Sequence, residues 1–129
     1  MGFLDIDISD VKEPTAVPGG EEYKLRISDV RQADDKNGAP YILPRFEISG
    51  EPTAKEFTKF LRLPHDGLDA KQLNGCKWQL KLFFDTFDID PSNIDLEDMI
   101  GAEGWAILGL EESDEWGEQN FVKKFIAPK

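Results

Sequence analysis

The chain has 129 residues, of which 40% are hydrophobic and 11% aromatic, and its formal net charge is −11. This length favours one domain, and the apolar content is sufficient for a compact core, which excludes a disordered or low-complexity chain. Taken as a total, the negative charge repels phosphates and anionic lipids, and so argues against nucleic acid or a membrane surface as a partner.

Cysteine content and apolar run length limit the cellular setting. The single cysteine, Cys76, has no partner for an internal disulfide, so we expect it to be a small core residue. No stretch approaches the roughly 18 to 20 apolar residues of a membrane span, and the amino terminus lacks the basic start and apolar run of a signal peptide. The sequence therefore predicts a cytoplasmic protein with no membrane partner.

Residues 1–22 are a predicted N-terminal arm. Apolar residues alternate with acids from Leu4 to Ile8, and a cluster of Pro and Gly follows between residues 14 and 20. This pattern predicts an extended strand or docking segment that leads into one domain over residues 23–129.

Three antiparallel strands are predicted after the arm. Apolar and polar residues alternate over 23–30, Asn37-Gly38 supplies the positive φ angles of a hairpin turn, and 41–48 is the returning strand. Pro44 within that second strand favours an edge position or a bulge. Residues 56–63, which are rich in β-forming and charged residues, are the predicted third strand.

The hydrophobic period changes after the third strand. From about residue 69 to residue 87, apolar residues recur every three or four positions, which predicts one amphipathic helix (Leu73, Cys76, Leu80, Phe83 or Phe84, and Phe87). A short acidic helix is predicted over 95–100. Two more strands, 104–110 and 120–126, are separated by a predicted loop over 111–118.

The order of these elements defines the expected fold class. Three strands, a helix and two strands are the order of a five-stranded OB-fold, a mainly β barrel with one α-helix between its third and fourth strands. A small α+β sandwich would show the same order of elements.

The sequence carries no recognisable catalytic or metal-binding motif. His65 has no second His or Cys to complete a metal site, so we expect it to be a plain loop residue. Asp88 and Asp90 have the Asp-x-Asp spacing of a calcium loop, but the Gly and the closing Glu of an EF-hand are missing, which favours a solvated acidic surface. We therefore predict that the protein is not an enzyme and needs neither cofactor nor metal.

The charges are distributed unevenly along the chain. The arm (1–22) carries a net −5 and residues 82–118 carry −12 with no basic residue, whereas residues 23–81 and 119–129 each carry +3. The basic segments contain the first three strands, most of the long helix and the last strand, and in an OB barrel the first three strands and the last are close neighbours. The molecule is thus expected to have one basic face, and the total charge no longer excludes single-stranded DNA.

Aromatic and basic residues interleave on the predicted basic strands, as single-strand binding requires, because bases stack on aromatic rings while Lys and Arg contact phosphates. Trp116 joins them, because it lies in the predicted loop between the last two strands, where burial is difficult. For Tyr41, Phe57, Phe121 and Phe125, a place in the core stays open as the alternative. We expect Phe46, Phe60, Phe83, Phe84 and Phe87 to be core residues. The candidate DNA-binding residues are Lys24, Arg26, Tyr41, Arg45, Phe57, Lys59, Arg62, Trp116, Phe121, Lys123 and Phe125.

Short segments along the chain are similar to one known family. They are MGFLD at 1–5, EYKLRI at 22–27, KNGAPY at 36–41 and RFEI at 45–48, with 100–107 and GEQNFV at 117–122 near the end. In these segments the chain resembles phage-encoded single-stranded-DNA-binding proteins of the OB-fold type. The resemblance implies protection of single strands during phage DNA replication or recombination, in the cytoplasm of a bacterial host. It implies a binding face at Lys24, Arg26, Tyr41, Arg45, Phe57 and Lys59.

We expect the acidic regions to bind any protein partners. Many proteins of this kind end in a flexible acidic tail, which this sequence lacks after the last strand, so the arm or residues 82–118 would recruit replication or recombination proteins. The arm could also add a strand to a neighbouring copy and form a homo-oligomer. The main alternative is an acidic protein–protein interaction module of a phage replication or packaging complex that does not bind DNA, and a metal-assisted enzyme is a third.

Overall fold

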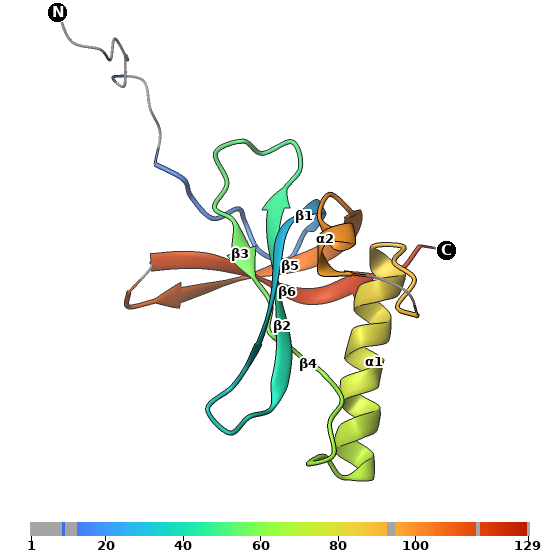
Figure 1. Ribbon diagram of the computed structural model, residues 1–129. Coiled ribbons are helices and arrows are strands. Elements are labelled where there is room, and N and C mark those ends of the chain that lie inside the picture. The colour runs from blue at the N-terminus through green and yellow to red at the C-terminus, as the bar shows by residue number, and fades with distance from the viewer. Residues whose placement is uncertain (1–8, 10–12, 93–94, 116, 129) are drawn as a thin grey trace, which may run out of the picture.

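The computed structural model describes residues 9, 13–92, 95–115 and 117–128, and this part of the chain is mainly β, as predicted (Figure 1). One antiparallel sheet has the strand order β3-β2-β1-β5-β6, with β4 also paired to β2. Helices α1 (Ala70–Thr86) and α2 (Leu96–Met99) lie between β4 and β5 in the chain. The strands are β1 (Glu22–Asp34), β2 (Pro40–Ile48), β3 (Phe57–Thr58), β4 (Leu61–Arg62), β5 (Glu103–Ser113) and β6 (Gly117–Ile126).

β1 and β2 form a long hairpin with an apolar inner face and a charged outer face. Leu25, Ile27 and Phe46 on the inner face are fully buried, as the alternation of the sequence predicts. The register shifts between Ile27 and Asp29, so Ser28 is an extra residue in β1. This bulge keeps the apolar side chains beyond it on the inner face of the hairpin.

The turn of this hairpin is held by a carboxylate. Asp35 accepts hydrogen bonds from the backbone N–H groups of Ala39 (3.0 Å) and Asn37 (2.8 Å). These bonds hold the pKa of Asp35 below its usual value, with smaller contributions from the nearby charges of Arg62 and His65. The reversal predicted at Asn37-Gly38 is confirmed, but only Gly38 has the expected positive φ, 82°, whereas Asn37 does not.

The third predicted strand is divided in two, which corrects the expected count of five strands to six. β3 and β4 pair with β2 in one register, and the division lies opposite Pro44. Proline has no N–H to donate to a neighbouring strand, and Lys59 N–H still donates to the Pro44 carbonyl (3.1 Å). No ladder joins β3 to β6 within the described ranges, so hydrogen bonds do not close the sheet into a barrel.

β5 and β6 form a second hairpin that is longer than predicted, because most of the expected loop at 111–118 is paired as strand. The two hairpins extend from the centre of the molecule in different directions (Figure 1). The β5–β6 ladder shifts by one residue at Lys123. Since side chains alternate between faces, this bulge directs Phe121 and Phe125 to opposite sides of the sheet.

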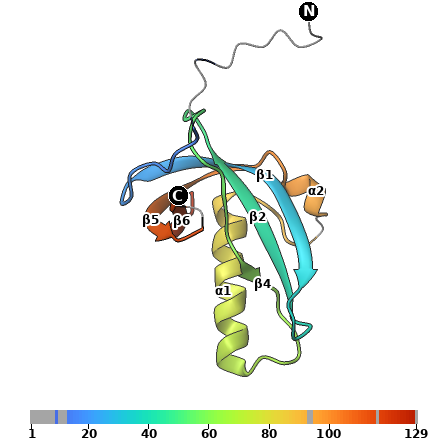
Figure 2. The ribbon, with the colours of Figure 1, turned by 90° about the vertical axis from the view of Figure 1, so that its left-hand side faces the viewer.

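α1 packs on the inner face only through its second half. It begins after Asp69, whose carboxylate accepts the N–H of Gln72 (2.8 Å), while the Gln72 side chain accepts the N–H of Asp69 (3.1 Å). Its buried residues, Leu80, Phe83 and Thr86, lie in the second half. The first half, residues 70–79, has no buried side chain and runs alongside β4 (Figure 2).

The core between α1 and the sheet is dominated by phenylalanine. Phe46 of β2 stacks on Phe87, with ring centroids 5.5 Å apart, and Phe83 and Phe125 meet the Phe46 ring edge-on. These contacts confirm the predicted core positions of Phe46, Phe83 and Phe87, whose rings are 0 to 3% exposed. Aromatic pairs of this kind stabilise a core beyond the area that they bury.

α2 is the short acidic helix predicted over 95–100. Its Met99 is buried, and the turn after it returns to β1, where Gly101 N–H donates to the Ile27 carbonyl (2.8 Å). Neither α1 nor any other helix in the described residues has the length and apolar character to cross a membrane.

Part of the predicted arm is bound to the sheet. Asn120 of β6 is buried, and its amide accepts the N–H of Val17 and donates to the Val17 carbonyl, both at 2.8 Å. Thr15 pairs with Ala54 before β3. Residues 13–20 therefore connect the segment before β3 to β6. The alternating residues 4–8 lie outside the described residues.

Candidate nucleic-acid interface

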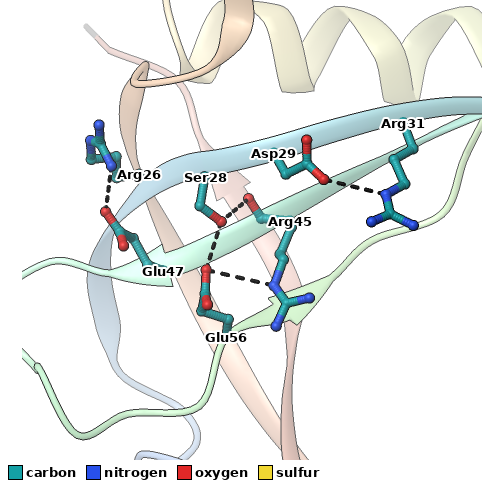
Figure 3. A network of polar contacts seen from close by, with 7 residues as sticks. All are labelled: Arg26, Ser28, Asp29, Arg31, Arg45, Glu47 and Glu56. Carbon is teal, nitrogen blue, oxygen red and sulfur yellow. Dashed lines mark hydrogen bonds and ion pairs between the residues drawn. The ribbon is translucent and has the colours of Figure 1, made fainter. Parts of the chain in front are cut away.

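The outer face of β1 and β2 carries three arginines, and each has a carboxylate beside it (Figure 3). Arg26, a predicted site residue, lies with its Nη1 2.7 Å from Glu47 Oε1. Arg31 Nε lies 3.3 Å from Asp29 Oδ2. The β1–β2 register places Arg26 opposite Glu47, whereas Arg31 and Asp29 lie two residues apart on β1 and so share one face.

Arg45, also a predicted site residue, belongs to a three-residue network. Its Nε lies 3.6 Å from Glu56 Oε1, and the Ser28 hydroxyl donates to the same Glu56 oxygen at 2.7 Å (Figure 3). Ser28 Oγ also lies 3.3 Å from the Arg45 carbonyl. The bulged Ser28 therefore helps to hold the Glu56 carboxylate toward the Arg45 guanidinium.

Lys24 is paired in the same way on β1. Its Nζ lies 2.9 Å from Glu103 Oε2 of β5. Trp105, which is opposite Lys24 in the β1–β5 ladder, has an exposed ring, and both side chains line a cavity of about 750 Å³ together with Glu22. This cavity combines one cation with two carboxylates, so it offers no net positive charge to a phosphate.

These four pairs define what we call the ion-paired face: Lys24, Arg26, Arg31 and Arg45 with their carboxylates. Exposed ion pairs contribute about 0 to 1 kcal/mol each to stability, so their main effect is on the availability of the cations. A phosphate that approaches this face competes with a carboxylate already in place. The sequence placed Lys24, Arg26 and Arg45 on the surface correctly but did not reveal their partners.

The half-buried ring of Tyr41 and the exposed ring of Phe60 form what we call the aromatic platform. Their centroids are 4.7 Å apart, and the Phe60 ring is 49% exposed, which corrects its predicted place in the core. Phe60 extends the register of β4 opposite Leu43, so it shares the outer face with Tyr41 and Arg62, whereas Leu61 takes the inner face.

A groove of about 380 Å³ lies next to the aromatic platform, between β4 and the first half of α1, and we call it the β4–α1 groove. Its lining contains two cations and no acidic residue, and both elements contribute apolar as well as polar residues (Lys59, Phe60, Leu61, Arg62, Gln72, Gly75, Cys76 and Gln79). Within the described part of the chain, neither Lys59 nor Arg62 makes an ion pair. This groove is therefore a basic site on an acidic protein.

Two predicted stacking residues are core residues, which corrects their assignment to the binding face. Phe57 is 7% exposed because it pairs with Phe46 in the ladder and so shares its inner face. Phe125 is 5% exposed because the bulge at Lys123 directs it inward. Their rings contact the Phe46 ring, with centroids 5.6 and 6.2 Å away, and neither is available to a base.

The remaining candidates lie on or near the β5–β6 hairpin. Phe121 is partly exposed and lies across Gly109, where an added Cβ would meet the ring at 2.3 Å. Lys123 is exposed at the bulge. Phe121 and Lys123 therefore do not share a face of the sheet with Phe125. The prediction for Trp116 falls outside the described residues.

The described residues contain no group of three or more side chains that could hold a metal ion. His65 Nδ1 accepts the N–H of Gly67 (3.1 Å) in the loop before α1. Cys76 is half-buried rather than a core residue, and its thiol donates to the Arg62 carbonyl (2.9 Å). Burial raises the pKa of this thiol above its usual value.

Sequence reasoning missed three exposed aromatic residues, Phe60, Trp78 and Trp105, whose rings are 49 to 56% exposed. For Phe60 a signal existed, because strict alternation over 56–63 puts it on the same face as Thr58 and Arg62. Trp78 lies on the helix face opposite the predicted apolar stripe. Trp105 stands at an outward position of the predicted strand 104–110.

Comparisons with known proteins give no family assignment. No protein-family model matches the chain, and no curated protein has a significantly similar sequence.

Proposed function

We propose that this protein binds single-stranded DNA without sequence preference and is not an enzyme. The observation that carries the proposal is the aromatic platform, in which the exposed Phe60 ring contacts the half-buried Tyr41 ring, with Lys59 and Arg62 beside it. Unpaired bases stack on exposed rings at about 1 to 3 kcal/mol each, while cations hold the backbone. In a duplex the base faces are already stacked, so this arrangement favours single strands.

The topology supports an OB-type barrel as the scaffold. If β3 and β4 count as one interrupted strand, the order of pairing and the helix before β5 match that fold. The Lys55 ammonium donates to the Glu118 carbonyl (3.0 Å), which brings the segment before β3 to the start of β6. In OB-folds the face of the second and third strands binds oligonucleotides, and the aromatic platform occupies the corresponding place.

A titration of fluorescent oligo-dT of about 20 nucleotides, followed by anisotropy, tests this proposal. We expect binding that weakens strongly between about 50 and 200 mM salt, and much weaker binding of a duplex of the same length. Equal affinity for single strand and duplex would contradict the stacking role of the platform.

The acidic β5–β6 hairpin favours a second candidate function, an acidic module that engages basic replication or packaging proteins. Its tip exposes a group of carboxylates (Glu111, Glu112, Asp114, Glu115 and Glu118). The same titration separates the two functions, because a module of this kind gives no anisotropy change with oligo-dT at either salt concentration.

A further inference from the structure

We infer that the bound single strand leaves the aromatic platform along the β4–α1 groove, so that α1 forms one wall of the binding site. The inference rests on the proposed function and adds a direction and a second set of contacts to it. Lys59 and Arg62 would then bind backbone phosphates inside the groove, and the first half of α1 would contact the strand.

The chemistry of the groove fits a phosphate backbone. The chain carries a net charge of −11, yet two cations and no carboxylate line the groove, and neither cation makes an ion pair with any residue that the structure describes. Phe60 belongs to both the groove and the aromatic platform, so the two sites are continuous. A strand that stacks one base on Phe60 therefore has its neighbouring phosphates within reach of the cations.

The backbone of β4 adds donors to the same wall. Lys59 N–H and Leu63 N–H donate to the carbonyls of Pro44 and Pro40 in β2. Because successive residues of a strand alternate in direction, the N–H groups of Phe60 and Arg62 point to the other side, toward α1. The Arg62 carbonyl does face α1, since it accepts the Cys76 thiol. Backbone N–H groups are common phosphate ligands.

The opposite wall, formed by the first half of α1, is open. Residues 70–79 of α1 contribute no buried side chain, and an added Cβ at Gly75 would meet no atom within 4 Å. Gln72 and Gln79 extend from this wall with amides that can bond to bases or phosphates. The helix thus presents two amide side chains to the groove beside Cys76, which packs against the core.

Charge substitutions at Gly75 test the inference in the intact chain. Gly75 lines the groove, whereas its neighbour Asn74 is exposed and does not. We expect Gly75→Glu to weaken binding of oligo-dT about fivefold and Gly75→Lys to strengthen it by a similar factor, as one charge beside a phosphate in water does. Asn74→Glu changes the net charge equally and is the matched control, with an expected change below about twofold.

The outcomes separate this inference from the proposed function. If wild type binds oligo-dT but Gly75→Glu and Asn74→Glu weaken it equally, the groove is not part of the path and the inference is overturned. If none of the variants changes the affinity for oligo-dT, the inference is also overturned. This result is expected if the groove binds an acidic peptide and not DNA. If wild type does not bind oligo-dT at low salt, both the function and the inference are wrong.

Cys76 provides an independent readout of groove occupancy. It is the single cysteine of the chain and lines the groove. Because burial raises the pKa of its thiol, modification by a maleimide is measured at pH about 8, where enough thiolate forms. We expect saturating oligo-dT to slow the modification severalfold in wild type and in Asn74→Glu. A modification rate that oligo-dT leaves unchanged would contradict the inference.

Discussion

The ion-paired face and the β4–α1 groove contain similar cations in opposite electrostatic situations. On the ion-paired face, Lys24, Arg26, Arg31 and Arg45 each lie 2.7 to 3.6 Å from a carboxylate. In the groove, Lys59 and Arg62 share a cavity that no acidic residue lines. The number of cations on a surface therefore says little about anion binding until their partners are known.

Because of this difference in ion pairing, binding a phosphate should cost less free energy in the groove than on the ion-paired face. A cation in the groove has no carboxylate at ion-pair distance among the described residues, although Arg62 also interacts electrostatically with Asp35. An arginine on the ion-paired face must give up a carboxylate or leave it facing the phosphate. Since counterion release drives association with nucleic acid, the groove contributes more per cation. Substitutions in the two regions should therefore differ in effect.

The largest effect is expected from the double variant Lys59→Ala/Arg62→Ala. Two charge-assisted bonds at roughly 1.5 kcal/mol each predict about a hundredfold loss of affinity for oligo-dT. The double variant Arg26→Ala/Arg31→Ala removes the same charge from the ion-paired face and should lose less than about tenfold. Anisotropy titrations of both at one salt concentration make the comparison, and equal losses would contradict it.

Phe60→Ala tests the aromatic platform and should have the next largest effect. Removal of one stacking ring costs about 1 to 3 kcal/mol, so we expect roughly tenfold weaker binding with an unchanged dependence on salt. Trp78→Ala removes an equally exposed ring from α1 and is the control, with unchanged affinity expected. Similar losses of affinity in both variants would show that the aromatic platform contributes no more to binding than any other exposed aromatic ring.

Glu56→Gln should strengthen binding, because it releases Arg45 from its carboxylate while the amide can still accept the Ser28 hydroxyl. We expect a gain of roughly two- to fivefold in affinity at low salt that disappears at high salt. The same titration measures it. A loss of affinity would mean that Glu56 holds Arg45 in a binding orientation rather than competing for it.

Gly75→Ala concerns stability and has the smallest expected effect on function. Gly75 lies inside α1 in open space, so alanine should raise the free energy of unfolding by about 0.5 to 1 kcal/mol without altering oligo-dT affinity. Urea denaturation followed by circular dichroism measures the gain. A destabilised variant would show that the helix needs the glycine for a close contact.

The sequence predicted the elements well because their signals are local. Alternation located β1 and β2, Asn37-Gly38 located the turn, and the three- and four-residue spacing located α1 within one residue of its ends. The division between β3 and β4 depends on Pro44 in a neighbouring strand, which no local window over 56–63 contains.

The site was predicted less well, because exposure and ion pairing are tertiary properties. Phe57 and Phe60 are three residues apart in one segment, yet one is buried against Phe46 and the other is exposed beside Tyr41. A single bulge at Lys123 directs Phe125 into the core, which was the alternative to its predicted place on the binding face. Ion pairs such as Arg26–Glu47 join residues 21 positions apart, so the chain order could not reveal them.

The salt dependence of oligo-dT binding tests the central claim most directly. The slope of log affinity against log salt counts the cations that replace counterions on the phosphates, at about 0.7 per phosphate for a single strand. We predict that Lys59→Ala/Arg62→Ala reduces this slope by about 1.4, whereas Arg26→Ala/Arg31→Ala changes it by less than about half as much. An unchanged slope in the groove variant, together with a reduced slope in the ion-paired variant, would contradict the account.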